Sequence, residues 1–248
     1  MNIGLYQSAS ALSALERWQD AVAQNITSSD TNGFRKRTTN FSTTTAGQIQ
    51  TDPGPRAGSD TVFQTLFPKV NTAISFTTGQ TQPTRRELDI AIQGDGFFEI
   101  QMPDGSRAYT RNGEFRLSSD RTLMAGPGQV MTEAGAPITL LQNGQPLVMN
   151  RDGTLFQGDV AIGRLSVQRF ADPSRLIPGA GGFFIPSPGM EPEPVEEPEL
   201  MQGYLESSNV TPLREMVDLV LISRAYEANQ KIISTIEQQM QKTLEALG

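Results

Sequence analysis

Apolar residues recur every seven positions along the last part of the chain, within the stretch 211–247. Thr211 suits a helix N-cap and Pro212 suits the first helical position, where a missing N–H costs nothing. No further Pro or Gly interrupts this stretch. The spacing therefore predicts one long amphipathic helix with a heptad pattern. The first series is Leu219, Tyr226, Ile233, Met240 and Leu247. The companion series is Ile222, Asn229, Ile236 and Thr243, of which two members are polar.

A narrow apolar stripe on a helix needs a second surface to bury it. Two interpretations stay open at this point. The helix lies on the globular body of its own chain, or it packs with other helices from the same chain or from neighbouring chains. The polar seam residues Asn229 and Thr243 do not decide between them, because both arrangements tolerate polar seam positions.

A second amphipathic helix is predicted over residues 3–28, with Ser8 and Gln19 as the polar members of its seam. Asn32-Gly33 is a strong turn signal after it. A coiled coil between the two terminal helices would explain both stripes. The apolar members of the N-terminal seam are Leu5, Leu12, Leu15, Val22 and Ile26.

The middle of the chain has the pattern of short strands. Residues 88–92 alternate between apolar and polar or small side chains, and Pro103-Asp104-Gly105 reads as a tight hairpin turn. We expect an α+β chain: long N- and C-terminal helices forming a coiled coil, and a central antiparallel β-rich domain. The expected segments are helix 1–30, a connecting arm with short strands at 31–84, a β domain at 85–185, a return segment at 186–210 and helix 211–248.

Residues 186–200 are acidic and rich in proline, with five Glu. Prolines hold such a chain extended and space its carboxylates apart. This composition favours a solvated linker over a cation site.

Composition narrows the functional classes. The 248 residues carry a net charge of −7, which argues against nucleic acid as the main partner. The chain has no Cys and no His, which excludes disulfides, the usual Cys/His zinc sites and His-based catalysis. The N-terminus has neither a basic start nor an unbroken apolar run, so we expect no cleaved signal peptide and no membrane insertion.

Catalytic chemistry finds little support in the residues. Gly94-x-Gly96 reads as a turn between strands, since no dinucleotide-type helix follows it. Glu99, Asp104 and Glu114 could serve a glycosidase, but exposed carboxylates are common enough to explain them. We expect no enzymatic activity, no cofactor and no metal site.

Three stretches, in the expected order, resemble the signatures of the bacterial flagellar rod and hook proteins. Ala23–Arg35 is similar to the motif that ends the first helix of that family. Leu88–Phe98, with Tyr109–Phe115, looks like its central signature. Gly203–Val210, with Glu215–Val217 and Arg224–Asn229, is similar to its C-terminal signature. The length is similar to that of basal-body rod subunits, and proximal- and distal-rod types both stay open.

The resemblance implies a structural subunit of the flagellar basal-body rod, assembling through its terminal helices into a shaft that transmits torque. It implies as partners copies of the chain, other rod or hook subunits and the flagellar type III export apparatus, and a location in the periplasm-spanning rod, reached without a cleaved signal. A hook or other axial subunit is one alternative. A secreted β-domain enzyme or glycan-binding module is another.

We expect the terminal helices to be partly disordered until neighbouring subunits bind them. The resemblance also assigns roles to two sets of residues. The expected assembly interface is Leu12, Leu15, Val22, Ile26, Leu219, Tyr226, Ile233 and Met240. The residues carrying the family motif are Asn25, Asn32, Gly33, Phe34, Gly94, Gly96, Phe97, Asn209 and Val210.

Overall fold

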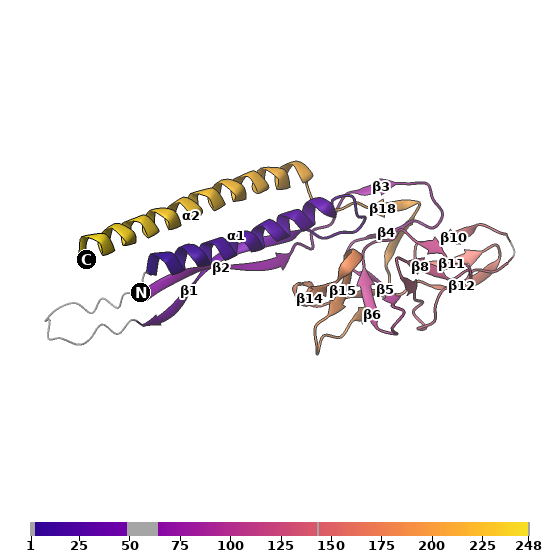
Figure 1. The fold of residues 1–248 in the computed structure, drawn as a ribbon. Coiled ribbons are helices and arrows are strands. Elements are labelled where there is room, and N and C mark those ends of the chain that lie inside the picture. Colours follow the sequence, from indigo (N-terminus) through magenta and orange to yellow (C-terminus); the bar gives the residue numbers. More distant parts are fainter. Residues whose placement is uncertain (1–2, 49–63, 143, 248) are drawn as a thin grey trace. The chain divides into compact units, whose positions relative to one another are not determined.

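The computed structural model describes residues 3–48, 64–142 and 144–247 (Figure 1). Its residues fall into two compact units that interleave along the chain. The helical unit combines the described residues of Met1–Ile26, Arg37–Ala73 and Thr211–Gly248. The β unit combines Thr27–Lys36 with the described residues of Ile74–Val210. Each unit is described below by itself.

The helical unit contains two helices and a two-stranded sheet. Helix α1 spans Ile3–Thr27 and α2 spans Pro212–Leu247, close to the ranges that the apolar spacing predicted. Strand β1 (Arg37–Gln48) pairs with β2 (Gln64–Ile74). In Figure 1, α1 and α2 run in opposite directions.

The two helices meet through a short apolar cluster rather than along a seam. Leu15 and Val22 of α1 and Ile222 of α2 are buried together. Trp18, Ile26, Ala225 and Tyr226 pack against them as half-buried neighbours. The contact thus involves the C-terminal half of α1 and the first turns of α2.

The predicted coiled coil is wrong: within the described residues the helices form no such seam. Glu215 and Ile222 are the buried side chains among the described residues of α2, and Leu219 and Met240 are 37% and 46% exposed. A coiled coil would bury both seams of both helices. The hairpin β1–β2 takes part of the surface of α1, since the rings of Trp18 and Phe41 lie 5.3 Å apart, edge to face. The α+β class holds only in broad terms, as two terminal helices and a β-rich middle.

The β unit contains the remaining strands, and every strand pair recorded in it is antiparallel. Its largest sheet has the order β14-β15-β6-β5-β9-β8-β7, with β13 pairing with both β5 and β16. These strands are β5 Phe97–Gln101, β6 Arg107–Thr110, β7 Arg116–Leu117, β8 Leu123–Ala125, β9 Gly128–Val130, β13 Val167–Arg169, β14 Leu176–Pro178, β15 Phe183–Pro186 and β16 Glu193–Pro194.

Smaller sheets and two helical turns complete this unit. A three-stranded sheet has the order β10-β11-β12, and two pairs are β17 with β4 and β18 with β3. The 3-10 turns are Pro173–Arg175 and Ala180–Gly182. The strands are β3 Thr81–Pro83, β4 Ile90–Gln93, β10 Leu147–Met149, β11 Thr154–Gln157, β12 Val160–Arg164, β17 Glu199–Gln202 and β18 Tyr204–Glu206.

The segment 186–210 contains three strands, β16, β17 and β18, which pair with β13, β4 and β3. The return of the chain from the β domain is thus hydrogen-bonded into the β unit. The sequence-based division into five segments stays a prediction about domains.

Two apolar cores stabilise the β unit. The larger one includes Phe98, Ile100, Phe115, Leu155 and Leu165, none of which exposes any measurable surface. The smaller one is aromatic, with Phe97, Tyr109, Phe170 and Phe184 in ring contact at 4.9–5.9 Å. Successive residues of β5 point to opposite faces, so Phe98 and Ile100 enter the larger core and Phe97 enters the smaller one, and both faces of the strand are buried.

The short helix contact gives a first prediction. We expect Ile222→Ala to lower the melting temperature of the helical unit, because Ile-to-Ala truncations in a core cost about 2–5 kcal/mol. Met240→Ala, at a predicted seam position that is exposed, should cost roughly 0.5 kcal/mol or less. Helical circular dichroism during heating measures both. Equal losses at the two positions would mean that a longer seam is buried in solution.

Candidate functional site

Asn25 links the elements of the helical unit through one buried amide, which we call the Asn25 bridge (Asn25, Arg37 and Glu215). Its Nδ2 donates to the Arg37 carbonyl and to Glu215 Oε2, both at 2.8 Å. Its Oδ1 accepts from the Arg37 N–H at 2.8 Å. Asn25 and Glu215 are each 1% exposed. Only an amide can donate to two acceptors and accept at the same time here, which explains Asn rather than Asp.

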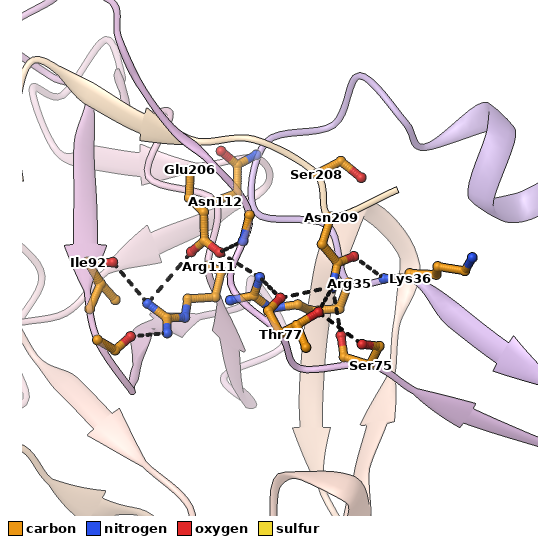
Figure 2. A network of polar contacts seen from close by, with 12 residues as sticks. Arg35, Lys36, Ser75, Thr77, Ile92, Arg111, Asn112, Glu206, Ser208 and Asn209 are labelled. Carbon is orange, nitrogen blue, oxygen red and sulfur yellow. Dashed lines mark hydrogen bonds and ion pairs between the residues drawn. The ribbon is translucent and has the colours of Figure 1, made fainter. Parts of the chain in front are cut away.

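Two arginines and one glutamate form a buried charge cluster in the β unit (Figure 2). Arg35 Nη1 lies 2.5 Å from Glu206 Oε1, and Arg111 Nη1 lies 3.7 Å from Glu206 Oε2. All three side chains are about 3% exposed or less. We call Arg35, Arg111 and Glu206 the arginine–glutamate cluster. It joins a residue from each of the three motif stretches.

Arg111 is held by backbone carbonyls as well as by charge. Its Nη1 donates to the Ile92 carbonyl at 3.2 Å, and its Nη2 donates to the Gly94 carbonyl. Its guanidinium lies 5.6 Å from the centroid of the Phe97 ring, a cation–π distance. Burial lowers the pKa of Arg111 to about 10, against the opposing effect of Glu206. Glu206 therefore compensates the Arg111 guanidinium only in part for the hydration that burial removes.

Asn209 fixes the segments on either side of this cluster (Figure 2). Its Oδ1 accepts from the Lys36 N–H at 2.6 Å. Its Nδ2 donates to the carbonyls of Ser75, at 3.0 Å, and Thr77, at 2.9 Å. Arg35 Nη1 also donates to the Thr77 carbonyl, at 2.9 Å. Hydrogen bonds thus join three stretches that are far apart in sequence, at residues 35–36, 75–77 and 209.

Gly33 occupies a position that only glycine fits. Its φ is +69°, in the left-handed region, and a Cβ built there would lie 2.4 Å from the backbone carbon of Arg111. Its N–H donates to the Glu206 carbonyl at 2.7 Å. The close approach of three motif stretches therefore requires the absence of a side chain.

The structure places the other motif residues around the same cluster, in the β unit. Asn32 Nδ2 donates to Glu114 Oε2 at 3.3 Å, and the Phe34 carbonyl accepts from the Asn209 N–H at 3.4 Å. Gly94 supplies its carbonyl to Arg111, and Phe97 supplies its ring. Gly96 has a φ of +133°, and a Cβ there would lie 2.7 Å from Val167 Cγ1. Val210 is buried.

The predicted assembly residues divide into two groups. Leu15, Val22, Ile26 and Tyr226 meet in the apolar cluster around Ile222. Leu12 and Ile233 are half-buried, and Leu219 and Met240 are exposed. The structure brings the first four together within one chain, and the role of all eight in assembly stays a prediction.

Sequence reasoning did not assign the charged residues of the motifs. Arg35, Arg111, Glu206 and Glu215 are each buried. Charged residues are rarely buried unless they are paired. The available signals were a charge two residues after Gly33 and a charge between Thr110 and Asn112 in a strand-and-turn pattern.

Sequence reasoning also missed an exposed apolar face at the start of α2. Leu213, Met216, Val217 and Val220 are 52–74% exposed. Their spacing of i, i+3, i+4 and i+7 places them on one face. Ile222 lies two residues after Val220, or about 200° of helical rotation away, so it is on the opposite face. We call these four residues the exposed face of α2.

Metal-binding and membrane-spanning features are not found in the part of the chain that the structure describes. No group of three or more Asp or Glu side chains there could hold a metal ion. No helix among the described residues is long and apolar enough to cross a membrane.

These features define a structural subunit: buried polar contacts fix two units, and a long terminal helix presents an apolar face to solvent. The match to a family model described as "Flagellar basal body rod FlgEFG protein C-terminal" covers residues 201–246. A second model, "Flagellar hook protein FlgE/F/G D1 domain", matches residues 91–157. The first match includes Glu206 and the second includes Arg111, whereas Arg35 lies outside both.

Curated relatives match along the whole chain. The flagellar basal-body rod protein FlgF of Caulobacter vibrioides is 32% identical over 100% of this chain and 99% of its own length. FlgF of Rhizobium meliloti is 33% identical over the same shares. The basal-body rod protein FlgG of Borreliella burgdorferi is 31% identical over 93% of each chain. The chain therefore belongs to the flagellar basal-body rod protein family, and it is a structural subunit of the basal-body rod.

Gly33 gives a prediction for the motif contacts. Gly33→Ala should lower the free energy of unfolding of the β unit by about 3 kcal/mol, from left-handed strain and a backbone clash together. Gly105→Ala is the matched control, because Gly105 has a φ of +82° but no atom within 4 Å of a built Cβ. That control should cost about 1 kcal/mol. Hydrogen exchange of the β5 and β6 amides measures both, and equal costs would contradict the close approach.

Proposed function

We propose that the exposed face of α2 is the surface through which this rod subunit binds neighbouring axial subunits. The observation that carries the proposal is the pair of opposite apolar faces on one helix. Ile222 is buried at 1% exposed, whereas Leu213, Met216, Val217 and Val220 are left in water. A helix with apolar residues on both faces is typical of one that is covered on both sides.

The neighbour that covers this face is a helix of another rod or hook subunit. Apolar side chains at helical spacing accept a helix by ridge-and-groove packing. Polar residues take over farther along α2, as at Gln230, Gln238 and Gln239. The first turns of α2 are therefore the anchor of the contact. The predicted interface residues Leu219, Ile233 and Met240 lie within about 60° of helical rotation of Ile222, so they belong to its face of the helix and not to the exposed face.

The gaps in the alignments support a proposal about the position in the rod. The Caulobacter FlgF alignment needs 249 positions to cover the whole of this 248-residue chain, so it places about one gap in this chain. The Borreliella FlgG alignment needs 254 positions for 93% of the chain. We therefore propose a FlgF-type place in the rod rather than a FlgG-type place.

The role is mechanical and includes no chemical step, no nucleic acid and no insertion into a membrane. Torque passes through subunits whose units resist deformation, and the buried polar contacts of the Asn25 bridge and the arginine–glutamate cluster supply that resistance. Export by the flagellar type III apparatus, without a cleaved signal, is part of the same proposal.

The exposed face gives the main test. We expect Val217→Asp and Val220→Asp each to reduce rod assembly at least about tenfold, because an unpaired charge buried in an apolar contact costs several kcal/mol. Electron microscopy of basal bodies from a strain whose only copy carries the variant measures this. Motility in soft agar is the second measurement.

The control for these variants is Gln230→Asp, which adds the same charge at an exposed polar position of α2. It should leave the rod intact, and circular dichroism should show all three chains folded. Normal rods from both valine variants would reject the exposed face as an interface. Equal loss from the control would point to charge on α2 rather than to that face.

Export without processing gives a separate test. The chain recovered from purified basal bodies should retain its N-terminal residues up to α1, apart from removal of the initiator Met. Mass spectrometry of the intact protein measures this directly. A shorter chain, starting inside or after α1, would show that a leader is removed.

A further inference from the structure

A cavity of about 440 Å³ lies beside the arginine–glutamate cluster, entirely within the β unit. Its volume falls in the range of small-molecule sites, about 300–1,000 Å³. Arg35 and Arg111 both line it, as do the rings of Phe76, Phe97 and Phe170. It therefore combines apolar aromatic walls with buried guanidinium groups, the composition of a site for an amphipathic anion.

The buried charges beside this cavity do not balance, although the exposed Asp95, Arg169 and Glu193 bring the total to zero. Arg35 and Arg111 bring two positive charges, and Glu206 brings one negative charge, all three nearly fully buried. Asp95 also lines the cavity, but it is exposed. The exposed pair Arg169 and Glu193, 3.1 Å apart, neutralise each other at the edge. The deep part of the site therefore carries an excess of positive charge.

Each of the two arginines also has an N–H donor without an acceptor. Among the described residues, neither Arg35 Nε nor Arg111 Nε has an acceptor, although both atoms are buried. A buried polar group without a partner costs about 1–3 kcal/mol, and more if it is charged. Burial moreover lowers the pKa of Arg111. An anion in the cavity would offset the desolvation of Arg111 through its charge.

We propose that this cavity binds a carboxylate carried on a small apolar or aromatic body. Guanidinium groups bind carboxylates by charge-assisted hydrogen bonds that are stronger than neutral ones. The three phenylalanine rings would contact the apolar body. Neither the FlgF-type place nor the exposed face of α2 enters this proposal, so its test uses the soluble chain and does not require assembly.

The carboxylate could come from a free small molecule or from an acidic segment of a second copy. The chain displays such a segment at 191–199, where all five Glu are exposed. Two probes therefore separate the sources. One is phenylacetate. The other is a peptide of residues 190–200, with a control peptide in which each Glu is replaced by Gln.

Binding is measured by NMR on the full-length soluble chain, from the shifts of the arginine Hε signals and of the Phe76, Phe97 and Phe170 rings. We expect saturable shifts with phenylacetate, and none with benzyl alcohol, its uncharged counterpart. Tighter binding by the acidic peptide than by phenylacetate would identify the segment of a second copy as the source. The reverse order would identify a small molecule.

Substitutions in the cavity test whether phenylacetate binds there. Ala171 lines the cavity and is exposed, so Ala171→Trp should fill part of it without disturbing the fold. We expect at least a tenfold loss of phenylacetate affinity in Ala171→Trp and in Arg111→Gln, with partial recovery in Arg111→Lys. Arg121→Gln is the matched control, since Arg121 is half-buried and does not line the cavity.

The proposal is overturned if neither probe produces saturable shifts in the native chain. It is also overturned if Ala171→Trp binds phenylacetate as tightly as the native chain does. In either case the arginine–glutamate cluster would have a structural role alone, and the exposed face of α2 would be unaffected.

Discussion

One buried carboxylate, Glu206, constrains the β unit more than any other group. Removing a charge from water costs several kcal/mol, and that cost is met only when opposite charges and hydrogen bonds surround it. Arg35 and Arg111 supply them from two other parts of the sequence. These three side chains must therefore come together for the unit to fold, and Gly33 allows the backbones to approach closely enough (Figure 2).

The helical unit also has a buried carboxylate, Glu215, which accepts a hydrogen bond from an amide. The Asn25 bridge connects α1, β1 and α2 through one amide, next to a small apolar cluster around Ile222. Because this cluster is short, most of α2 is available to other molecules. The buried polar contacts are thus inside the units, and the apolar residues at the start of α2 are left exposed.

The coiled-coil prediction was wrong for a reason that the sequence does not show. The heptad spacing of Leu219, Tyr226, Ile233 and Met240 specifies a face of a helix, but not what covers that face. In the structure α1 divides its apolar surface between α2 and the hairpin β1–β2, so no continuous seam remains. The spacing of Leu213, Met216, Val217 and Val220 was equally regular, and its meaning emerged only from their exposure.

The sequence by itself determined the two terminal helices, the strand-rich middle and the family, because helical spacing, alternation and the three motif stretches are local patterns. It also named a set of motif residues, without saying what they contact. Only the tertiary structure decided that Arg35, Arg111 and Glu206 share one site and that Asn25 reaches Glu215, 190 residues away. Such pairings depend on which segments become neighbours when apolar surface is buried, and no local pattern encodes that choice.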